Sequence, residues 1–416
     1  MPRKLTKKQK REINNAVKSH WKIILVLILL VAVFAVLAYF MGWFDILKNK
    51  LFPDDKDDYL STAGGHVTTL ESVKPLEVAF LDVGQGDCMI IELPDGKTMI
   101  IDSGDSVSDQ TVIGDYAAAN NITAFDYMLL THQDADHVSN MDWVLKNYTV
   151  RYIFRPNNYS KHDYSASLPA EFNPVIEDKD AQSTTKAYAE FMVEAYNEGC
   201  TVEIFNKESD FTNKIICGDK EYSYTFDFLT PTANRTNILY SDPNDYSPLV
   251  LLEYAGRKIM FTGDAETDVL EEYLTTYGSN AHNIDVLKVG HHGSHNATSP
   301  EFVSALDPEY AVIQCGYGND YGHPHDSALN ALKNYDGNMV LYRNDLHRDI
   351  VLSIDVVGNM TWDIEVDDVI ASNLWKSGNS LTGEGPIATG RNLNGMDIWN
   401  AIIEGYVMSY KKEMVV

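Results

Sequence analysis

The sequence predicts an α/β (α+β) protein whose β-sheets carry helices on their outer faces. Two observations lead to this class. Short apolar runs typical of strands alternate with helix-like segments along residues 76–364, which indicates strand–helix units. Three pairs of these runs are separated by tight Gly-containing turns, which indicate antiparallel hairpins, at residues 94–96, 255–256 and 358–359. A chain of 416 residues with 44% hydrophobic content is long enough to bury such a core.

The elements follow one another in the order that these patterns give. Strands are expected where four to seven residues are mainly apolar, β-branched or aromatic, over residues 78–83, 89–93, 98–101, 127–130, 151–154, 201–205, 224–229, 249–254, 258–262, 284–289, 310–313, 350–356 and 360–364. Helices are expected where mixed apolar and polar segments lie between these runs, over residues 111–119, 139–146, 184–198, 266–276, 300–305 and 326–332.

The first 44 residues have the composition of a membrane anchor. Residues 1–22 carry eight Lys or Arg against one acidic residue, Glu12, and residues 23–44 form an uncharged apolar run flanked by Trp21 and Trp43. About 20 apolar residues can cross a hydrocarbon core of about 30 Å, and Trp is enriched at both interfaces. Because basic residues concentrate on the cytoplasmic side, we expect a single-pass protein of the cell membrane with an extracytoplasmic body. A cleaved signal peptide is the alternative.

The rest of the chain divides by composition. Residues 45–75 are polar, contain Gly and Pro and lack periodicity, which predicts a stalk. The body covers residues 76–366, and residues 367–416 form a C-terminal extension with a Gly-rich stretch and an amphipathic helix expected over residues 396–410. We expect the extension to pack on the body as a strap.

Charge and cysteine spacing exclude two kinds of site. The net charge of −27 excludes a broad basic face, so a nucleic-acid substrate would have to be held by a local site and its metal ions. The four cysteines lack the spacing of a cysteine-based metal site. Outside the cytoplasm, Cys200 and Cys217 could form a disulfide, and two separate thiols are the alternative.

A cluster of metal-type ligands follows the strand predicted at residues 127–130. His132, Asp134, Asp136 and His137 fall within six residues on a strand-to-helix turn, which lets their side chains converge. This spacing predicts a site for divalent cations.

Further histidines and one carboxylate follow later predicted strands. Asp264 ends a hairpin strand, the adjacent His291 and His292 end another, and His323 follows a third. Adjacent histidines at a strand end usually point to different partners, because a buried imidazole needs one. Their repeated position at strand ends is typical of a metal-centred active site.

Together these motifs resemble the metallo-β-lactamase superfamily, and within it the extracytoplasmic hydrolase domain of the ComEC/Rec2 competence proteins. The resemblance covers about residues 76–365. It is carried by the His/Asp cluster and by residues 81–87 (Leu-Asp-Val-Gly-Gln-Gly-Asp), 101–104 (Ile-Asp-Ser-Gly), 262–264 (Thr-Gly-Asp), 287–294 (Leu-Lys-Val-Gly-His-His-Gly-Ser) and 322–325 (Gly-His-Pro-His). It implies a four-layer αββα sandwich with the active site along one edge of the sheets. Only one anchor is present in this sequence, so the resemblance does not imply DNA uptake.

The resemblance also implies a set of ligands for two divalent ions. His132 and Asp134 would bind the first ion. Asp136, His137 and His292 would bind the second, and Asp264 would bridge the two. His291 could exchange roles with His292. Asp102 would orient the metal-binding loop without binding metal itself.

The chemistry of such a site follows from its metal ions. Two cations about 3.5–4 Å apart can share a hydroxide and stabilise charge at an attacked phosphorus or carbonyl carbon, so Asp136 and Asp264 belong to the catalytic core. His323 is a candidate for contacting substrate or protonating a leaving oxygen, and Lys288 and Ser294 are candidate phosphate contacts. The alternative roles are ordinary: a loop histidine, a solvated strand-end charge and a turn hydroxyl.

Two positions depart from the usual pattern of the superfamily. Asp134 stands where a second histidine is usual, and residues 244–247 (Asn-Asp-Tyr-Ser) stand where an isolated histidine usually precedes the bridging Asp. A first metal site that is rich in oxygen shifts the preference from zinc towards manganese. The expected cofactors are therefore two Zn²⁺ or two Mn²⁺ ions.

The sequence therefore predicts a membrane-anchored, extracytoplasmic, metal-dependent hydrolase. Its expected substrate is a phosphodiester, in nucleic acid or in a cell-envelope polymer. Hydrolysis of a lactam, a lactone or another carboxylic substrate is the second reading, and a non-catalytic surface binding module is the third. The intact His/Asp cluster argues against the third. The sequence indicates no protein partner.

Overall fold

The computed structural model describes residues 63–170, 172–173, 182–183, 185–199, 201–231, 240, 242–278, 282–335, 338–364 and 368–381. Within these residues no helix has the length and apolar character needed to cross a membrane. The predicted anchor at residues 23–44, the predicted helix at residues 396–410 and Cys200 lie outside the described residues. Cys217, the other half of the possible disulfide, is a free thiol that lies 3.3 Å from the carbonyl oxygen of Glu71.

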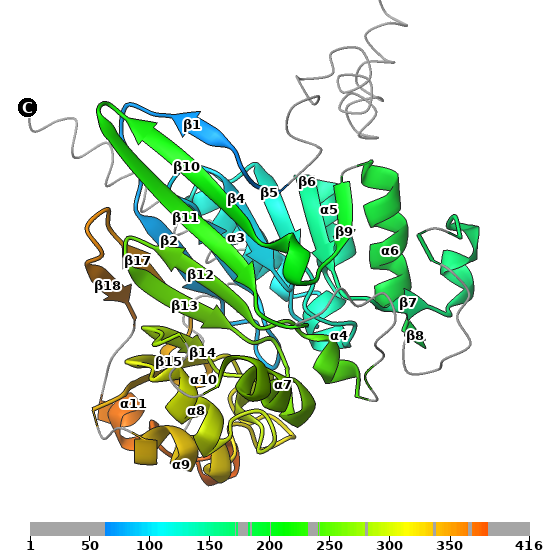
Figure 1. Ribbon diagram of the computed structural model, residues 1–416. Coiled ribbons are helices and arrows are strands. Elements are labelled where there is room, and N and C mark those ends of the chain that lie inside the picture. The colour runs from blue at the N-terminus through cyan, green and yellow to red at the C-terminus, as the bar shows by residue number, and fades with distance from the viewer. Residues whose placement is uncertain are drawn as a thin grey trace, which may run out of the picture. The chain divides into compact units, whose positions relative to one another are not determined.

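Two eight-stranded sheets lie face to face (Figure 1). Sheet A contains, in spatial order, β1 (Val67–Thr69), β10 (Phe211–Cys217), β11 (Lys220–Phe228), β12 (Val250–Tyr254), β13 (Arg257–Phe261), β14 (Val286–Lys288), β15 (Tyr310–Ile313) and β16 (Val340–Arg343). Sheet B contains β18 (Met360–Asp363), β17 (Ile350–Ile354), β2 (Leu76–Phe80), β3 (Met89–Glu92), β4 (Thr98–Ile101), β5 (Ala124–Leu129), β6 (Thr149–Arg155) and β9 (Thr201–Ile204). The short strands β7 (Tyr159–Ser160) and β8 (Gln182–Ser183) pair separately.

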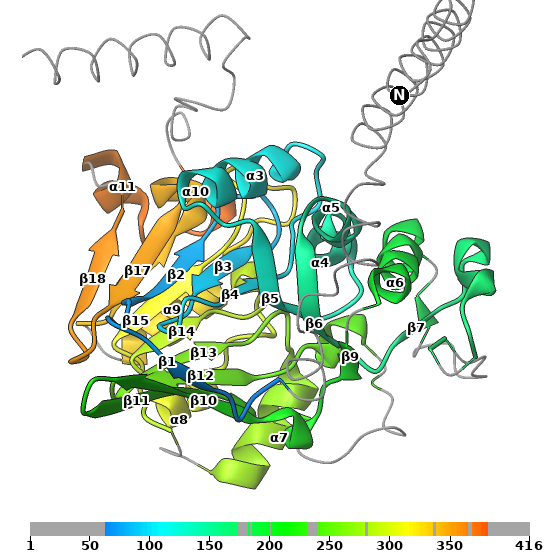
Figure 2. The ribbon, with the colours of Figure 1, turned by 90° about the horizontal axis from the view of Figure 1, so that it is seen from above.

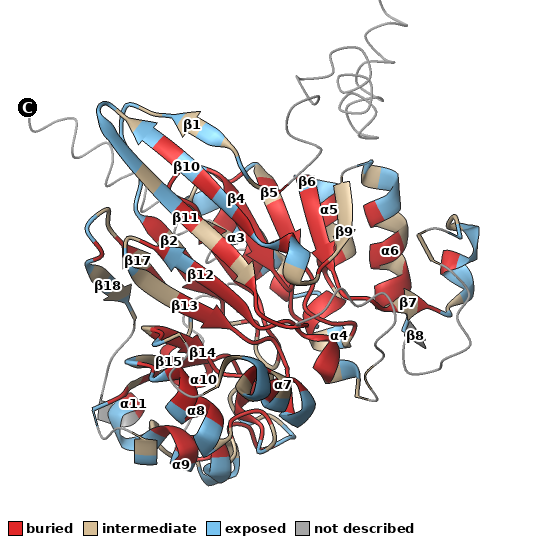
Figure 3. Ribbon diagram, in the orientation of Figure 1, coloured by how far each residue is buried: buried red, intermediate tan, exposed pale blue. Residues whose placement is uncertain are grey.

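The inner faces of the two sheets form the central core. Along β11 the residues alternate between exposed or half-buried and buried, so Tyr224, Phe226 and Phe228 point inward while the residues between them point outward. They pack against strands of sheet B, where the Phe154 ring lies 5.2 Å from that of Phe228. Each such aromatic side chain stabilises the fold by roughly 1.5–3 kcal/mol through burial. Figure 3 shows central strands of sheet B such as β5 and β6 buried over most of their length, whereas the edge strands β1 and β18 are exposed or half-buried.

Helices cover both outer faces, so the fold has four layers. On sheet B the apolar faces of α3 (Asp109–Ala119), α5 (Met141–Asn147) and α6 (Lys186–Glu198) form a second core with the outward residues of β2–β6. On sheet A a third core contains residues of α7 (Thr267–Tyr277), α8 (Pro300–Leu306) and α9 (Asp326–Tyr335). Figure 2 shows α3 and α5 on one side of the paired sheets and α7 and α8 on the other. The predicted sandwich of two sheets with outer helices is confirmed.

The three predicted hairpins are present as antiparallel pairs: β3 with β4, β12 with β13, and β17 with β18. Five strands were not predicted: the short β1, β7 and β8, and the longer β10 and β16. In β10 the polar Asn213 stands at a core position, which hides the alternation. Its side chain is buried and donates hydrogen bonds to the hydroxyls of Tyr127 and Tyr224.

Both ends of the described chain pack on the sandwich. Residues 67–69, expected to belong to a stalk, form β1, which pairs in parallel with β10, so the ordered body begins before Leu76. Three residues between polar neighbours give too short a run to predict a strand. At the other end, α11 (Asp368–Asn373) leads into a segment held by the buried Arg343, whose guanidinium donates to the carbonyl oxygens of Leu374 and Lys376.

Candidate metal centre

The His/Asp cluster lies where β5 ends in sheet B. After Thr131 the chain turns into the short helix α4 (Ala135–Val138), with Asp134 at its N-cap position in extended conformation. His132 and His137 are fully buried, whereas Asp134 and Asp136 are partly exposed. The imidazole rings of His132 and His137 lie 4.2 Å apart, so the turn brings these side chains together as the spacing predicts.

Loops from sheet A supply the remaining polar groups. Asp264 follows β13 and His292 follows β14, and these two parallel strands are neighbours. The Asp264 Oδ2 atom lies 3.2 Å from His137 Nε2 and 3.3 Å from His292 Nε2, and the latter atom lies 3.2 Å from Asp136 Oδ2. One ligand atom from each of the four residues lies within 4.8 Å of the others. This cluster could hold a metal ion.

Two further buried atoms support a cation at this place. Nε2 of His132 and Oδ1 of Asp264 are buried, and neither makes a hydrogen bond within the described structure. Buried polar atoms almost always have a partner, and a bound cation would satisfy both of these atoms. Imidazole nitrogen and carboxylate oxygen are the donors that Zn²⁺ and Mn²⁺ accept. The residues present therefore fit a divalent cation.

The electrostatics of the cluster favour positive charge. Burial would lower the pKa of His137 and of His292, but carboxylates outweigh burial, Asp264 first, and raise both pKa values well above the usual range. For Asp264 burial acts to raise the pKa, and the neighbouring histidines, His137 first, lower it well below its usual range. The raised pKa values favour protonated histidines in this negatively charged site. A bound metal ion would replace those protons.

Behind the cluster, Asp102 fixes the orientation of His137. Its Oδ2 atom lies 2.8 Å from His137 Nδ1, and the carboxylate also accepts hydrogen bonds from the backbone N–H and the hydroxyl of Thr131. Asp102 is fully buried and has φ 55°, a left-handed conformation that costs energy for a residue other than glycine. The carboxylate contacts the back of the imidazole and leaves Nε2 free for the cation site.

Replacing Asp102 with Asn is expected to lower metal affinity by about 10–100-fold, because the amide keeps the shape but removes the negative charge from behind His137. Titration of the metal-free protein with Mn²⁺ or Zn²⁺ measures this. Asp126→Asn is the matched control, since that carboxylate pairs with Arg151 on the same sheet. Equal affinities for both variants would show that Asp102 does not support the metal site.

His291 and His292 take different places. His292 belongs to the four-residue cluster, and its Nδ1 lies 2.9 Å from the carbonyl oxygen of Gln314. His291 places Nε2 3.7 Å from Asp264 Oδ2 and directs Nδ1 to Glu266 at 2.7 Å. Of these two residues, His292 belongs to the cluster that could hold a metal ion, and His291 lies beside the Asp264 carboxylate.

Residues 244–247 do contact the site, although the usual histidine is absent. The Ser247 hydroxyl lies 3.2 Å from His132 Nδ1 and accepts a hydrogen bond from the backbone N–H of Asp264. Asn244 donates to Glu266. The sequence shows only a departure from the usual pattern here, and the contact between Ser247 and His132 had no signal in it.

The cluster opens into a small cavity of about 120 Å³. It is lined by Gln85, Asp134, Asp136, Asn244, Asp264, His291, His292, Tyr321 and His323. His323 reaches it from the loop after β15. Burial, followed by the charges of His292 and His291, lowers the pKa of His323 to about 3, so its ring is neutral near pH 7.

The structure places Lys288 and Ser294 outside this cavity. Lys288 is fully buried, and its Nζ lies 2.6 Å from Asp87 Oδ2 beneath His292, so the predicted substrate contact is wrong for this side chain. Ser294 is 3% exposed and donates to Asn296 Oδ1. The Lys288 side chain is buried because it forms an ion pair with Asp87. Asp87 belongs to the loop after β2, which is distant from Lys288 in the sequence.

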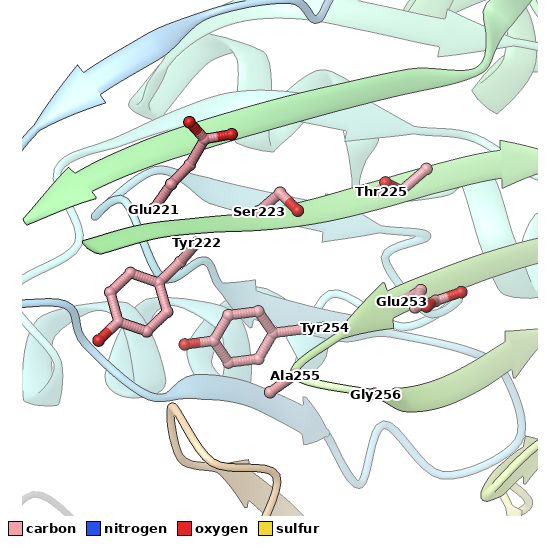
Figure 4. A pocket seen from close by; sticks show the side chains of 8 residues that line it. All are labelled: Glu221, Tyr222, Ser223, Thr225, Glu253, Tyr254, Ala255 and Gly256. Atoms are coloured by element: carbon pink, nitrogen blue, oxygen red, sulfur yellow. The ribbon is translucent and has the colours of Figure 1, made fainter. Parts of the chain in front are cut away.

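A second cavity, of about 300 Å³, lies on sheet A where β11 extends past the β12–β13 turn (Figure 4). It is lined by Glu221, Tyr222, Ser223, Thr225, Glu253, Tyr254, Ala255 and Gly256. It is larger than the cavity at the His/Asp cluster but contains no histidine. Size alone therefore does not mark the reactive site, and the chemistry of the lining residues does.

The chain is similar in sequence and fold to known metal-dependent hydrolases and competence proteins. Residues 81–317 match the model of the Metallo-beta-lactamase superfamily. The chain is 27% identical over 276 residues to ComE operon protein 3 of Bacillus subtilis, which covers 62% of this chain and 31% of that protein. It is 35% identical over 133 residues to Competence protein ComA of Neisseria gonorrhoeae, covering 31% of this chain and 18% of that protein. The chain thus spans less than a third of the length of these relatives.

A metallo hydrolase from Ignicoccus hospitalis is a similar solved structure, with 13% identity, a TM-score of 0.33, and coverage of 70% of this chain and 100% of that one. The resemblance to the competence-protein hydrolase domain is confirmed.

Proposed function

Because the chain belongs to the metallo-beta-lactamase superfamily, we propose that it is a metal-dependent phosphodiesterase that uses two divalent ions. The observation that carries this proposal is the convergence of ligand atoms from Asp136, His137, Asp264 and His292 within 4.8 Å of one another. Beside them, the buried Nε2 of His132 makes no hydrogen bond in the described structure and lies 4.0 Å from Asp134 Oδ2. We propose that His132 and Asp134 bind the first ion and Asp136, His137 and His292 the second, with Asp264 between them.

The chemistry that these ions supply is the activation of water near neutral pH and the stabilisation of negative charge on an attacked phosphoryl group. Asp102 holds His137 in place, and Ser247 contacts His132. The protein also excludes bulk water, since most of the ligand atoms are buried. A charge that develops in such a site is stabilised more strongly than in water.

His323 is suited to donate a hydrogen bond to a phosphoryl or leaving oxygen. Its Nδ1 lies 3.3 Å from Gln85 Nε2, and Gln85 Oε1 accepts a hydrogen bond from the backbone N–H of Gly316. The Gln85 amide therefore presents its NH₂ group to His323, so Nδ1 accepts and Nε2 carries the hydrogen. A neutral ring with Nε2–H donates a hydrogen bond without becoming a cation.

The phosphodiester reading has support from the relatives. One is named Competence protein ComA and the other ComE operon protein 3, and we base the choice of a phosphodiester on this resemblance to the competence-protein hydrolase domain. The described residues that line the cavity include no Lys or Arg, so a phosphate would be held by metal ions and by neutral groups such as His323. Lactam or lactone hydrolysis by the same cluster is the competing outcome.

We also propose that residues 23–44 anchor the protein in the cell membrane with the hydrolase domain outside. The proposal rests on the apolar run and the basic segment before it. A Cys introduced near Ser61 would react with an impermeant thiol reagent added to intact cells. Absence of labelling, with labelling restored after lysis, would place the domain inside.

The test of the activity begins with metal removal. We expect the chelated protein to lose all hydrolysis of a simple phosphodiester and of single-stranded DNA, and Mn²⁺ or Zn²⁺ to restore it. A chromogenic lactam is assayed in parallel. Diester cleavage that depends on metal supports the proposal, whereas lactam turnover alone would replace it with the competing one.

A further inference from the structure

One aromatic side chain at the cavity has no role in the function described so far. Tyr321 lines the cavity, yet 67% of the residue is exposed to solvent. A face of this ring is therefore accessible to a molecule bound at the cavity. The exposed face of the ring is available for contact with a bound substrate.

The ring is held in a fixed position. It stacks on His323 with ring centroids 5.6 Å apart and an angle of 17° between the planes. The loop that carries it is fastened by Asn319, whose side chain donates to the carbonyl oxygens of Gly316 and His323 and accepts from the His323 N–H. A ring that is already ordered loses little conformational entropy when a ligand stacks on it.

The C-terminal segment adds a second support to this loop. The backbone N–H of Gly378 donates to the carbonyl oxygen of Pro324, and a Cβ atom on Gly322 would lie 2.2 Å from the Asn379 side chain. The loop is thus packed between sheet A and the segment that follows α11. Its position does not depend on a bound ligand.

The place of the ring relates it to the metal cluster. His323 lies between Tyr321 and the cluster, with its ring centroid 5.4 Å from that of His291 and 6.0 Å from that of His292. A phosphate bound at the cluster would therefore carry its nearest substituent towards Tyr321. In a nucleic acid that substituent is a nucleoside.

We infer that Tyr321 is the stacking platform for a nucleobase of a single-stranded substrate, next to the phosphate that is cleaved. Aromatic side chains on which unpaired bases stack are the usual device of single-strand recognition, because every base has an aromatic face. This inference rests on the proposed phosphodiesterase function and specifies its substrate class.

Three features favour a base over the other groups that bind aromatic rings. Quaternary ammonium groups are usually bound by several rings that form a cage, and Tyr321 is the single Tyr, Phe or Trp among the described lining residues. The lining amides of Gln85 and Asn244 can meet the donors and acceptors on a base edge. A net charge of −27 opposes a long polyanion, so stacking has to supply affinity that a basic groove would otherwise give.

The test compares two substrates of equal length and charge, a short oligothymidylate and an oligomer of the same deoxyribose phosphates without bases. The full chain loaded with Mn²⁺ is assayed as wild type, Tyr321→Ala and Tyr321→Phe. Tyr321→Ala is expected to raise KM for oligothymidylate about tenfold with kcat little changed. Tyr321→Phe keeps the wild-type KM, and the rise in KM caused by Tyr321→Ala is several-fold larger for oligothymidylate than for the oligomer without bases.

Tyr164→Ala is the matched control, because Tyr164 is 48% exposed and does not line the cavity. An equal effect of Tyr321→Ala on both substrates, or no effect on either, would overturn the inference. Failure of the proposed function is recognised separately. If the wild type cleaves neither oligomer, binding to the metal-free protein is measured by fluorescence anisotropy at low salt. A preference for oligothymidylate that Tyr321→Ala removes supports the platform, and equal binding of both oligomers rejects it.

Discussion

Replacing Lys288 with Met is expected to destabilise the folded protein by about 3–5 kcal/mol. The ion pair between Lys288 Nζ and Asp87 Oδ2, at 2.6 Å, has both side chains fully buried. Lys288 also donates to the carbonyl oxygen of Val289. Removing the lysine would leave the Asp87 carboxylate buried without its cation.

The pKa of Asp87 shows how much this pair matters. Burial acts to raise that pKa, and Lys288, followed by His292, outweighs burial and lowers it. The group is therefore a carboxylate in the folded protein, and its charge depends on Lys288. Asp87 Oδ1 also lies 3.4 Å from His292 Nδ1, so the unbalanced charge would act directly on a metal-site histidine.

Chemical unfolding monitored by tryptophan fluorescence measures the loss of stability. Lys214→Met is the matched control, because Lys214 forms an ion pair of 2.8 Å with Glu221 at the surface, and exposed pairs contribute less than about 1 kcal/mol. The double variant Lys288→Met, Asp87→Asn removes both charges and should recover part of the loss. Wild-type stability in the Lys288→Met protein would refute a structural role for the pair. A single variant that fails to fold while the double variant folds would support it.

The sequence is most informative where the contributing residues are neighbours in the chain. His132, Asp134, Asp136 and His137 lie on one turn, so residue type and spacing were enough to predict that they converge. Hairpins were equally accessible, since a Gly-containing turn between two apolar runs leaves few other conformations. The two-sheet architecture follows from these local units together with the family resemblance.

Features that depend on distant partners could not be predicted in this way. Lys288 looked like a strand-end charge because nothing near it in sequence identifies Asp87 as its partner. Ser247 looked like a gap in the ligand pattern, whereas its hydroxyl contacts His132 and the Asp264 backbone. Tyr321 carried no signal, because an aromatic residue in a loop is usually packed. Each of these roles is set by tertiary contacts between elements of different sheets or loops.

Replacing Asp264 with Asn is expected to lower kcat by roughly 10³-fold or more, because loss of one metal-ligating carboxylate removes several kcal/mol of charge stabilisation at the reacting centre. Asp264 is the central group of the site. Its Oδ2 atom lies 3.2 Å from His137 Nε2, 3.3 Å from His292 Nε2 and 3.7 Å from His291 Nε2. No other described carboxylate makes contact with all three rings at these distances.

The variant also changes metal content, which separates this effect from a general loss of structure. Asn keeps the size of Asp264 and one oxygen atom but lacks the negative charge that balances the neighbouring histidines and the proposed metal ions. The number of bound Mn²⁺ or Zn²⁺ ions per chain should therefore fall along with kcat, while the unfolding transition remains cooperative. Asp245→Asn is the control, since this buried carboxylate accepts a hydrogen bond from the Glu266 backbone nearby and does not line the cavity. Its activity should stay within a few-fold of wild type. An Asp264→Asn protein with full activity and full metal content would show that the carboxylate neither bridges the ions nor contributes to catalysis.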